Sequence, residues 1–221
     1  MVDFMLYMGL SILETTAMLF LTFKIFKIDI YMKEILFAGI IMAFISYVLR
    51  HDYGLAQVDI LTQYILAFCF IWLLFRTHIF YAAIMNGLSY LCYTLIQSTY
   101  LLTMNLTGFF HLKFPSVTGS TYLLQILPAV TTIIIGLYIG KKRKGFDFVP
   151  DKPYGRIIIN KRDIILFAVS VPSVILVLAM IYLAEHYSQF FFLIPLMYGI
   201  ILNVYLRISY KKDRGDYEFN R

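Results

Sequence analysis

The sequence contains few charged residues for its length. Asp, Glu, Lys and Arg make up only 14% of its 221 residues, whereas 61% are hydrophobic and the mean hydropathy is +0.77. Water-soluble domains carry about 25% charged residues and are about half apolar. The composition therefore excludes an ordinary soluble domain. It predicts an all-α, polytopic helix bundle that is surrounded mainly by the lipid bilayer. We expect this bundle in the cell membrane, namely the cytoplasmic membrane of a bacterium.

Cysteine is scarce, and motifs of catalysis and metal binding are absent. Cys69 and Cys92 both lie in apolar runs, where cysteine usually packs as a small hydrophobic side chain. His51, His111 and His186 follow no metal-ligand spacing. The sequence has no HExxH, GxSxG or P-loop motif. We therefore expect no metal, no cofactor and no enzymatic activity.

Long apolar runs divide the chain into seven segments that are candidates for spanning helices. They are residues 4–23, 35–49, 57–75, 79–104, 120–140, 164–184 and 188–206. The second is the shortest, so we expect it to need a locally thinned bilayer or snorkelling by Lys33 and Arg50. The third and fourth are separated only by "RTH" (76–78), which predicts a tight helical hairpin.

The distribution of Lys and Arg gives the expected orientation. With seven spans, every Lys and Arg except Arg50 and Lys113 falls on the side of the carboxyl tail. The positive-inside rule then places the amino terminus outside and the carboxyl terminus in the cytoplasm. The expected organisation is a transmembrane bundle over residues 1–208, with a cytoplasmic loop at 141–163, and a short cytoplasmic tail at 209–221. Because the net charge of +6 belongs to residues that flank apolar segments, it does not predict nucleic-acid binding.

Polar residues inside the apolar segments are the candidate ligand site. Glu14 lies near the middle of the first segment, where a carboxyl group costs about 2.5–3.5 kcal/mol to insert. In the fourth segment one helical face carries four polar residues, namely Asn86, Tyr90, Tyr93 and Gln97. Such residues line a ligand or solvent cavity in one interpretation and bind helices together in the other.

Two further groups lie at the ends of segments. Asp59 and Gln63 are four residues apart at the start of the third segment. They form either an external recognition edge or a solvated loop in which Asp59 caps the helix. At the opposite side a basic cluster is predicted to contact a cytoplasmic partner or lipid headgroups; it consists of Lys141, Lys142, Arg143 and Lys144. Just before it, "GLYIG" (136–140) matches the small-xxx-small pattern of closely packed membrane helices.

The opening "ILETTAMLFLTFKIFKIDIYMKEILFAGIIMAFISYVLR" (12–50) has an apolar first helix, a short Lys-rich loop and a second helix ending in Leu-Arg. It resembles the membrane sensor region of Agr-type (GHKL-class) peptide-responsive histidine kinases. The resemblance implies an external peptide ligand and a cytoplasmic signalling partner. The sequence lacks the phosphoacceptor helix and ATP-binding domain of such kinases, so we expect it to act without phosphorylating anything itself.

Three functions follow from these features. The first is a non-enzymatic receptor-like or regulatory protein that senses an external peptide or small ligand and signals to a cytoplasmic partner such as a kinase. The second is the membrane substrate-binding subunit of a small-solute, vitamin-like transporter, with Glu14 and the polar face of the fourth segment as its site. The third is an immunity-type structural membrane protein without a ligand. The sequence does not predict an oligomeric state.

Overall fold

The computed structural model describes residues 2–107, 119–149, 164–168, 170 and 193–219. Its long helices are α1 (Val2–Ile25), α2 (Met32–Tyr47), α3 (Ala56–Cys69), α4 (Ile79–Leu106), α5 (Gly119–Lys142) and α7 (Leu193–Phe219). Two short π-helices, η1 (Val48–Asp52) and η2 (Phe70–Leu74), extend α2 and α3. This part of the chain contains no strand, which confirms the all-α class.

Six of the described helical segments are long and apolar enough to cross a membrane. They match six of the seven predicted segments, including the hairpin between the third and the fourth. The predicted segment 164–184 lies mostly outside the described residues. The last helix differs from its prediction, because α7 continues to Phe219 and so includes most of the predicted tail.

The second helix is longer than its predicted apolar segment. α2 and η1 together give a candidate span from Met32 to Asp52, 21 residues long. Arg50 lies within this helix, and its guanidinium group pairs with the buried carboxylate of Asp59.

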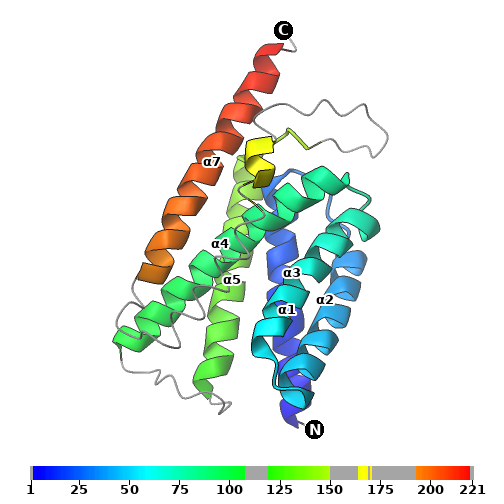
Figure 1. Cartoon of the computed structure of the whole chain (residues 1–221), viewed down its shortest axis with the longest axis vertical. Coiled ribbons are helices and arrows are strands. Elements are labelled where there is room, and N and C mark those ends of the chain that lie inside the picture. Colours follow the sequence, from blue (N-terminus) through cyan, green and yellow to red (C-terminus); the bar gives the residue numbers. More distant parts are fainter. Residues whose placement is uncertain (1, 108–118, 150–163, 169, 171–192, 220–221) are drawn as a thin grey trace.

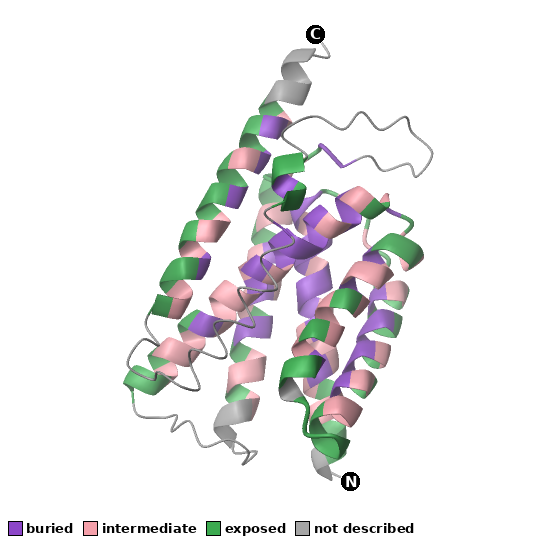
Figure 2. Cartoon of the chain, viewed as in Figure 1, coloured by how far each residue is buried: buried purple, intermediate pink, exposed green. Residues whose placement is uncertain are grey.

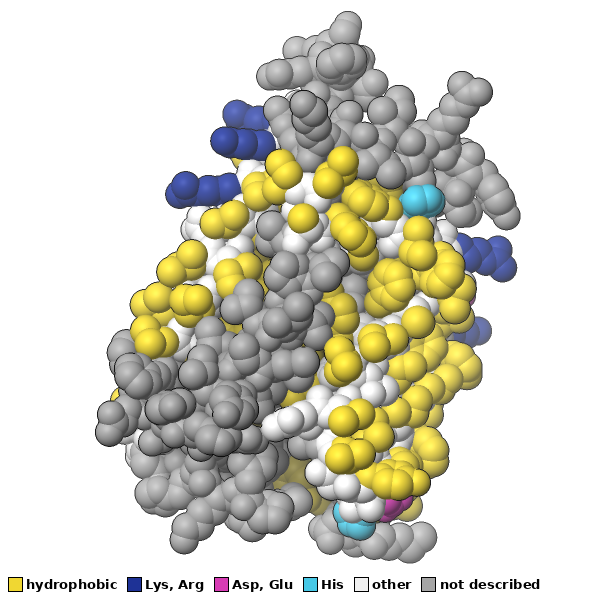
Figure 3. Space-filling view, viewed as in Figure 1, with side chains coloured by type: hydrophobic (Ala, Val, Ile, Leu, Met, Phe, Trp, Pro, Cys, Tyr) yellow, Lys and Arg dark blue, Asp and Glu magenta, His cyan; other side chains and the backbone are white. Residues whose placement is uncertain are grey.

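The helices pack around α1, which contacts α2, α4 and α5 (Figure 1). The side chains buried in this core are large and apolar, among them Leu19, Phe23, Ile84, Leu88 and Tyr205. Figure 2 shows the buried residues on the inward faces of the helices. In Figure 3 hydrophobic side chains cover much of the described surface, with Lys and Arg at the edges of the view. An apolar exterior of this kind fits a lipid environment.

Glycine permits close contacts between helices at three positions. A Cβ atom on Gly136 would lie 2.9 Å from a ring carbon of Phe20, and one on Gly140 would lie 2.9 Å from a side-chain carbon of Lys24. Both glycines of the "GLYIG" pattern therefore face α1. On α4, a Cβ atom on Gly87 would lie 2.5 Å from the Cβ of Ser170.

The ends of α1, α5 and α7 meet at one end of the bundle, which we call the basic end because Lys and Arg concentrate there. Here Lys27 pairs with Asp147 at 2.6 Å, and the backbone N–H of Asp147 donates to Asp213 at 2.8 Å. The ammonium group of Lys212 lies 4.2 Å from the ring centre of Phe148. The first residues after α5 are thus held against both α1 and α7.

Candidate functional site

Asp59 is the centre of a hydrogen-bonded network at the end of the bundle where α1 begins. Its side chain is completely buried. One carboxylate oxygen accepts from the Ser46 hydroxyl at 2.9 Å and from Arg50 Nε, and the other accepts from Gln63 at 3.2 Å. Three donors thus surround a carboxylate that has no contact with solvent. The prediction of a solvated Asp59 that caps its helix is wrong, because the N-cap of α3 is Leu55 and Asp59 points inward.

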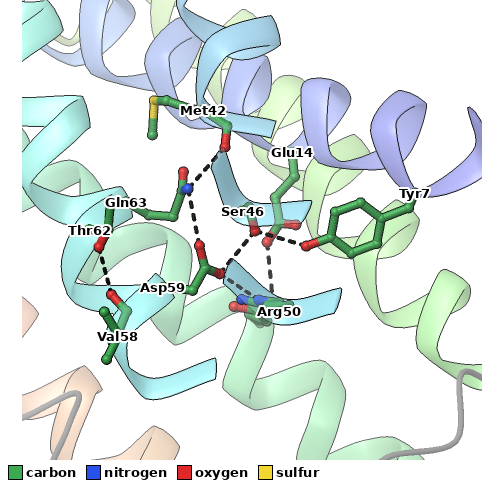
Figure 4. A network of polar contacts seen from close by, with 10 residues as sticks. Tyr7, Glu14, Met42, Ser46, Arg50, Val58, Asp59, Thr62 and Gln63 are labelled. Atoms are coloured by element: carbon green, nitrogen blue, oxygen red, sulfur yellow. Dashed lines mark hydrogen bonds and ion pairs between the residues drawn. The ribbon is translucent and has the colours of Figure 1, made fainter. Parts of the chain in front are cut away.

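The same network joins three helices (Figure 4). Tyr7 of α1 shares a hydrogen bond of 2.8 Å with the hydroxyl of Ser46 on α2. Gln63 of α3 donates to the backbone carbonyl of Met42 on α2 at 3.0 Å. Asp59 and its hydrogen-bonding neighbours therefore fix α1, α2 and α3 relative to one another. We refer to Tyr7, Ser46, Arg50, Asp59 and Gln63 as the Asp59 network.

Arg50 lies in η1, where the helix widens from α to π geometry. Tyr53 N–H donates to the carbonyl of Val48 at 3.3 Å, five residues back. Widened turns of this kind are rare and occur frequently at functional sites. The Arg50 side chain keeps 44% of its surface exposed while its Nε atom binds the buried carboxylate. It therefore links the interior of the bundle to the surface.

Glu14 lies next to this network and meets the polar face of α4. Gln97 donates to a Glu14 carboxylate oxygen at 3.5 Å. Tyr93, one turn before Gln97, lies beside Glu14, and the two side chains interact with each other. Figure 4 shows Glu14 beside the Asp59 network, and Glu14 interacts electrostatically with Arg50 and Asp59. Three predicted site residues, Glu14, Tyr93 and Gln97, are thus brought together.

The other half of the polar face of α4 has a different neighbour. Asn86 donates to the backbone carbonyl of Tyr64 on α3 at 3.0 Å. The Tyr90 ring packs edge-to-face on the Tyr64 ring, with centroids 5.1 Å apart. Asn86 and Tyr90 therefore bind α4 to α3, as the helix-binding interpretation expects. The polar face predicted as one unit is divided between two contacts.

The prediction of site residues missed Tyr7 and Ser46 and placed Arg50 only near the site. Helical spacing contains the signal, because Ser46 and Arg50 are four residues apart and Tyr7 and Glu14 are seven apart. Each pair lies on one helix face. Periodicity alone did not show that these two faces point toward Asp59.

The basic cluster lies outside this site. Lys141, Lys142, Arg143 and Lys144 are all exposed at the end of α5, where Arg143 takes a left-handed conformation (φ 49°) that ends the helix. The N–H of Lys144 donates to the carbonyl of Ile139 at 3.2 Å, a bonding pattern that closes many helix C-termini. The cluster is therefore accessible at the basic end.

The site is built from polar side chains inside an apolar bundle. Among the described residues no group of three His, Cys, Asp or Glu side chains is arranged to hold a metal ion. The site offers carboxylates, hydroxyls, the two amides of Gln63 and Gln97, and one guanidinium group within an apolar bundle. Polar groups in such surroundings are costly, about 2.5–3.5 kcal/mol for a charged side chain at the centre of a spanning helix.

Comparison of the chain with protein-family models, with curated proteins and with solved structures gave no match.

Proposed function

We propose that this chain is a receptor-like or regulatory membrane protein without enzymatic activity. In this proposal the first four helices bind a peptide or small ligand from outside, and the basic end transmits the change to a cytoplasmic signalling protein such as a kinase. The single observation that carries the proposal is the polar network that connects the four helices α1, α2, α3 and α4. Side chains from all four helices meet through Asp59 and Glu14 inside an otherwise apolar bundle.

The orientation in this proposal has the amino terminus outside and seven spans. The described Lys and Arg residues other than Arg50 lie at or toward the basic end, which supports a cytoplasmic position for that end. Residues 164–168 lie near the basic end, whereas α7 begins toward the opposite end (Figure 1). This arrangement supports a further crossing between them. Arg50 and the Asp59 network then lie toward the outside.

The mechanism is a shift between two packings of the helices. A ligand that alters the Asp59 network changes the relative positions of α1, α2 and α3. The carboxyl end of α1 is bonded to the segment after α5, since Phe146 N–H donates to the carbonyl of Ile25 at 2.7 Å. That segment in turn contacts α7 through Asp147 and Asp213. Movement of α1 is therefore passed to α5 and α7 at the basic end.

Native mass spectrometry of the full chain, gently purified from membranes, tests this function. We expect a co-isolating ligand or signalling partner. A Glu14→Gln variant should lose the ligand, and Glu34→Gln, a matched change of a glutamate at the other end of the bundle, should retain it. A protein that repeatedly emerges with neither ligand nor partner would contradict the proposal.

A transporter subunit is the second candidate, and the position of Glu14 favours it. Glu14 is near the middle of the α1 span, where solute sites of membrane transporters lie. The same purification distinguishes the two. Co-purifying ATPase subunits would identify the transporter, and a co-purifying kinase would identify the receptor.

A further inference from the structure

The hydrogen bonds of Asp59 show that this acid is ionised. Its Oδ2 atom accepts from the Ser46 hydroxyl at 2.9 Å and from Arg50 Nε, and its Oδ1 atom accepts from the Gln63 amide at 3.2 Å. The Tyr7 hydroxyl, 2.8 Å from the Ser46 hydroxyl, is the donor of that bond, since Ser46 gives its own proton to Asp59. A protonated carboxyl group needs a partner that accepts. The partners of Asp59 all donate, so Asp59 carries the negative charge.

One guanidinium group cannot balance two ionised acids. Arg50 pairs with Asp59, and the pair has no net charge. Glu14 lies beside this pair and interacts electrostatically with both members (Figure 4). An ionised Glu14 would add an uncompensated negative charge near the middle of the α1 span, which is costly. A proton bound to Glu14 removes that cost.

The neighbours of Glu14 on α4 suit a neutral acid. The Gln97 amide donates to one carboxyl oxygen, Oε1, at 3.5 Å. The Tyr93 side chain interacts with the same carboxyl group, and its hydroxyl can both donate and accept. A protonated carboxyl group has one O–H donor and keeps acceptor capacity. It can therefore bond to the amide and to the hydroxyl at once, without any charge.

The titratable and charged groups that face Glu14 come from the helices around it. They are Tyr7 of α1, Arg50 of η1, Asp59 of α3, and Tyr90 and Tyr93 of α4. α5 also packs on α1, but residues 123–137 of α5 contain no titratable side chain. Arg50 and Asp59 are thus the charged groups that determine the state of Glu14.

We propose that Glu14 is a proton-binding site, and that its proton determines which acid holds Arg50. With the proton in place, Arg50 pairs with Asp59 alone and the Asp59 network is complete. When the proton leaves, the O–H bond breaks, its electron pair stays on the carboxylate and the proton passes to water. Two ionised acids then share one guanidinium group, which weakens the pair between Arg50 and Asp59.

This inference rests on the proposed function and gives a physical basis for its two helix packings. The proton-bound form holds α1, α2 and α3 together through the complete Asp59 network, and the proton-free form loosens them. Glu14→Gln is permanently neutral and so imitates the proton-bound form. The loss of ligand expected in that variant then means that the ligand requires the proton-free form.

Infrared spectroscopy of the full chain in nanodiscs at neutral pH tests the site. We expect the C=O stretching band of a protonated carboxylic acid in the wild type and its loss in Glu14→Gln. Glu34→Gln removes a glutamate at the other end of the bundle and should keep the band. Tyr93→Phe should shift the band, because the Tyr93 side chain contacts the carboxyl group. Tyr100→Phe removes a hydroxyl that bonds to Thr131 at 2.7 Å, and should leave the band in place.

Asp59→Asn tests the link between the two acids. It removes the charge that balances Arg50, so Glu14 becomes the acid that pairs with Arg50 and should release its proton. The band should then disappear although Glu14 is still present. An acid that is protonated only because it is buried would keep its band in this variant. Asp52→Asn, an exposed position next to the network, is the matched control and should keep the band.

Three results would overturn the inference. They are a wild type without the band, a band that Glu14→Gln keeps, and a band that Asp59→Asn keeps. Circular dichroism and size-exclusion chromatography check the folding of each variant. If Glu14→Gln does not fold, the shift in Tyr93→Phe assigns the band to Glu14, and an unshifted band refutes the assignment.

The proton site and the receptor function can fail separately. A missing band in a protein that co-isolates with a ligand would refute the proton site and leave the receptor. The expected spectra in a protein that isolates with neither ligand nor partner would support the proton site and refute the receptor.

Discussion

Loss of Arg50 should destabilise the protein more than loss of the charge on Asp59. Arg50→Gln leaves the Asp59 carboxylate, which is 0% exposed, with only the donors Ser46 and Gln63. Removal of one partner from a buried ion pair costs about 3–5 kcal/mol. Asp59→Asn instead leaves Arg50, whose side chain is 44% exposed and can reach water or headgroups. That change removes mainly charge-assisted hydrogen bonds, at a cost of about 1.5–3 kcal/mol.

The double variant tests whether the two effects share one interaction. Arg50→Gln together with Asp59→Asn replaces an ion pair by two neutral amides that can still bond to each other. We expect its destabilisation to be about 2 kcal/mol smaller than the sum of the single effects, because residues in direct contact are coupled.

Unfolding by titration with sodium dodecyl sulfate in mixed micelles, followed by far-ultraviolet circular dichroism, gives the free energies. Lys33→Gln, at the other end of α2 and exposed, is the control, and should change stability by less than about 0.5 kcal/mol. The reasoning is refuted if Asp59→Asn is the more damaging single change or if the two effects simply add.

Two further substitutions test the packing. Gly87→Ala should destabilise the protein by about 1–3 kcal/mol, because the new Cβ would lie 3.0 Å from the Ser170 Cα and force the two backbones apart. Gly9→Ala is the control and should not destabilise the protein, because nothing lies within 4 Å of its Cβ. Equal melting temperatures of the two variants would contradict the Gly87 contact. Lys212→Met should cost about 1–2 kcal/mol, because Lys212 is 3% exposed and its ammonium lies against two aromatic rings. The exposed Lys142→Met is its control, and thermal melts showing equal losses at both positions would argue against the ring contacts.

Much of the site could be named from the sequence, but its contacts could not. Glu14 and the polar face of the fourth segment were predicted as parts of one site because polar groups are costly in lipid, and in the structure Gln97 of that face donates to Glu14 at 3.5 Å. The sequence favoured a solvated loop for Asp59, since a residue just after a turn is ordinarily exposed. The burial of Asp59 depends on how α3 is rotated about its own axis relative to α2. This rotation is set by the packing of the helices.

The sequence by itself determined that the chain is helical, apolar on its exterior and basic at one end. Hydropathy and charge act locally, through the free energy of placing each segment in lipid or water, so they can be read residue by residue. Only the tertiary structure decided which polar groups meet. Tyr7 and Ser46 are 39 positions apart and Glu14 and Gln97 are 83 apart, and such contacts arise only when packing sets the rotation of each helix about its own axis.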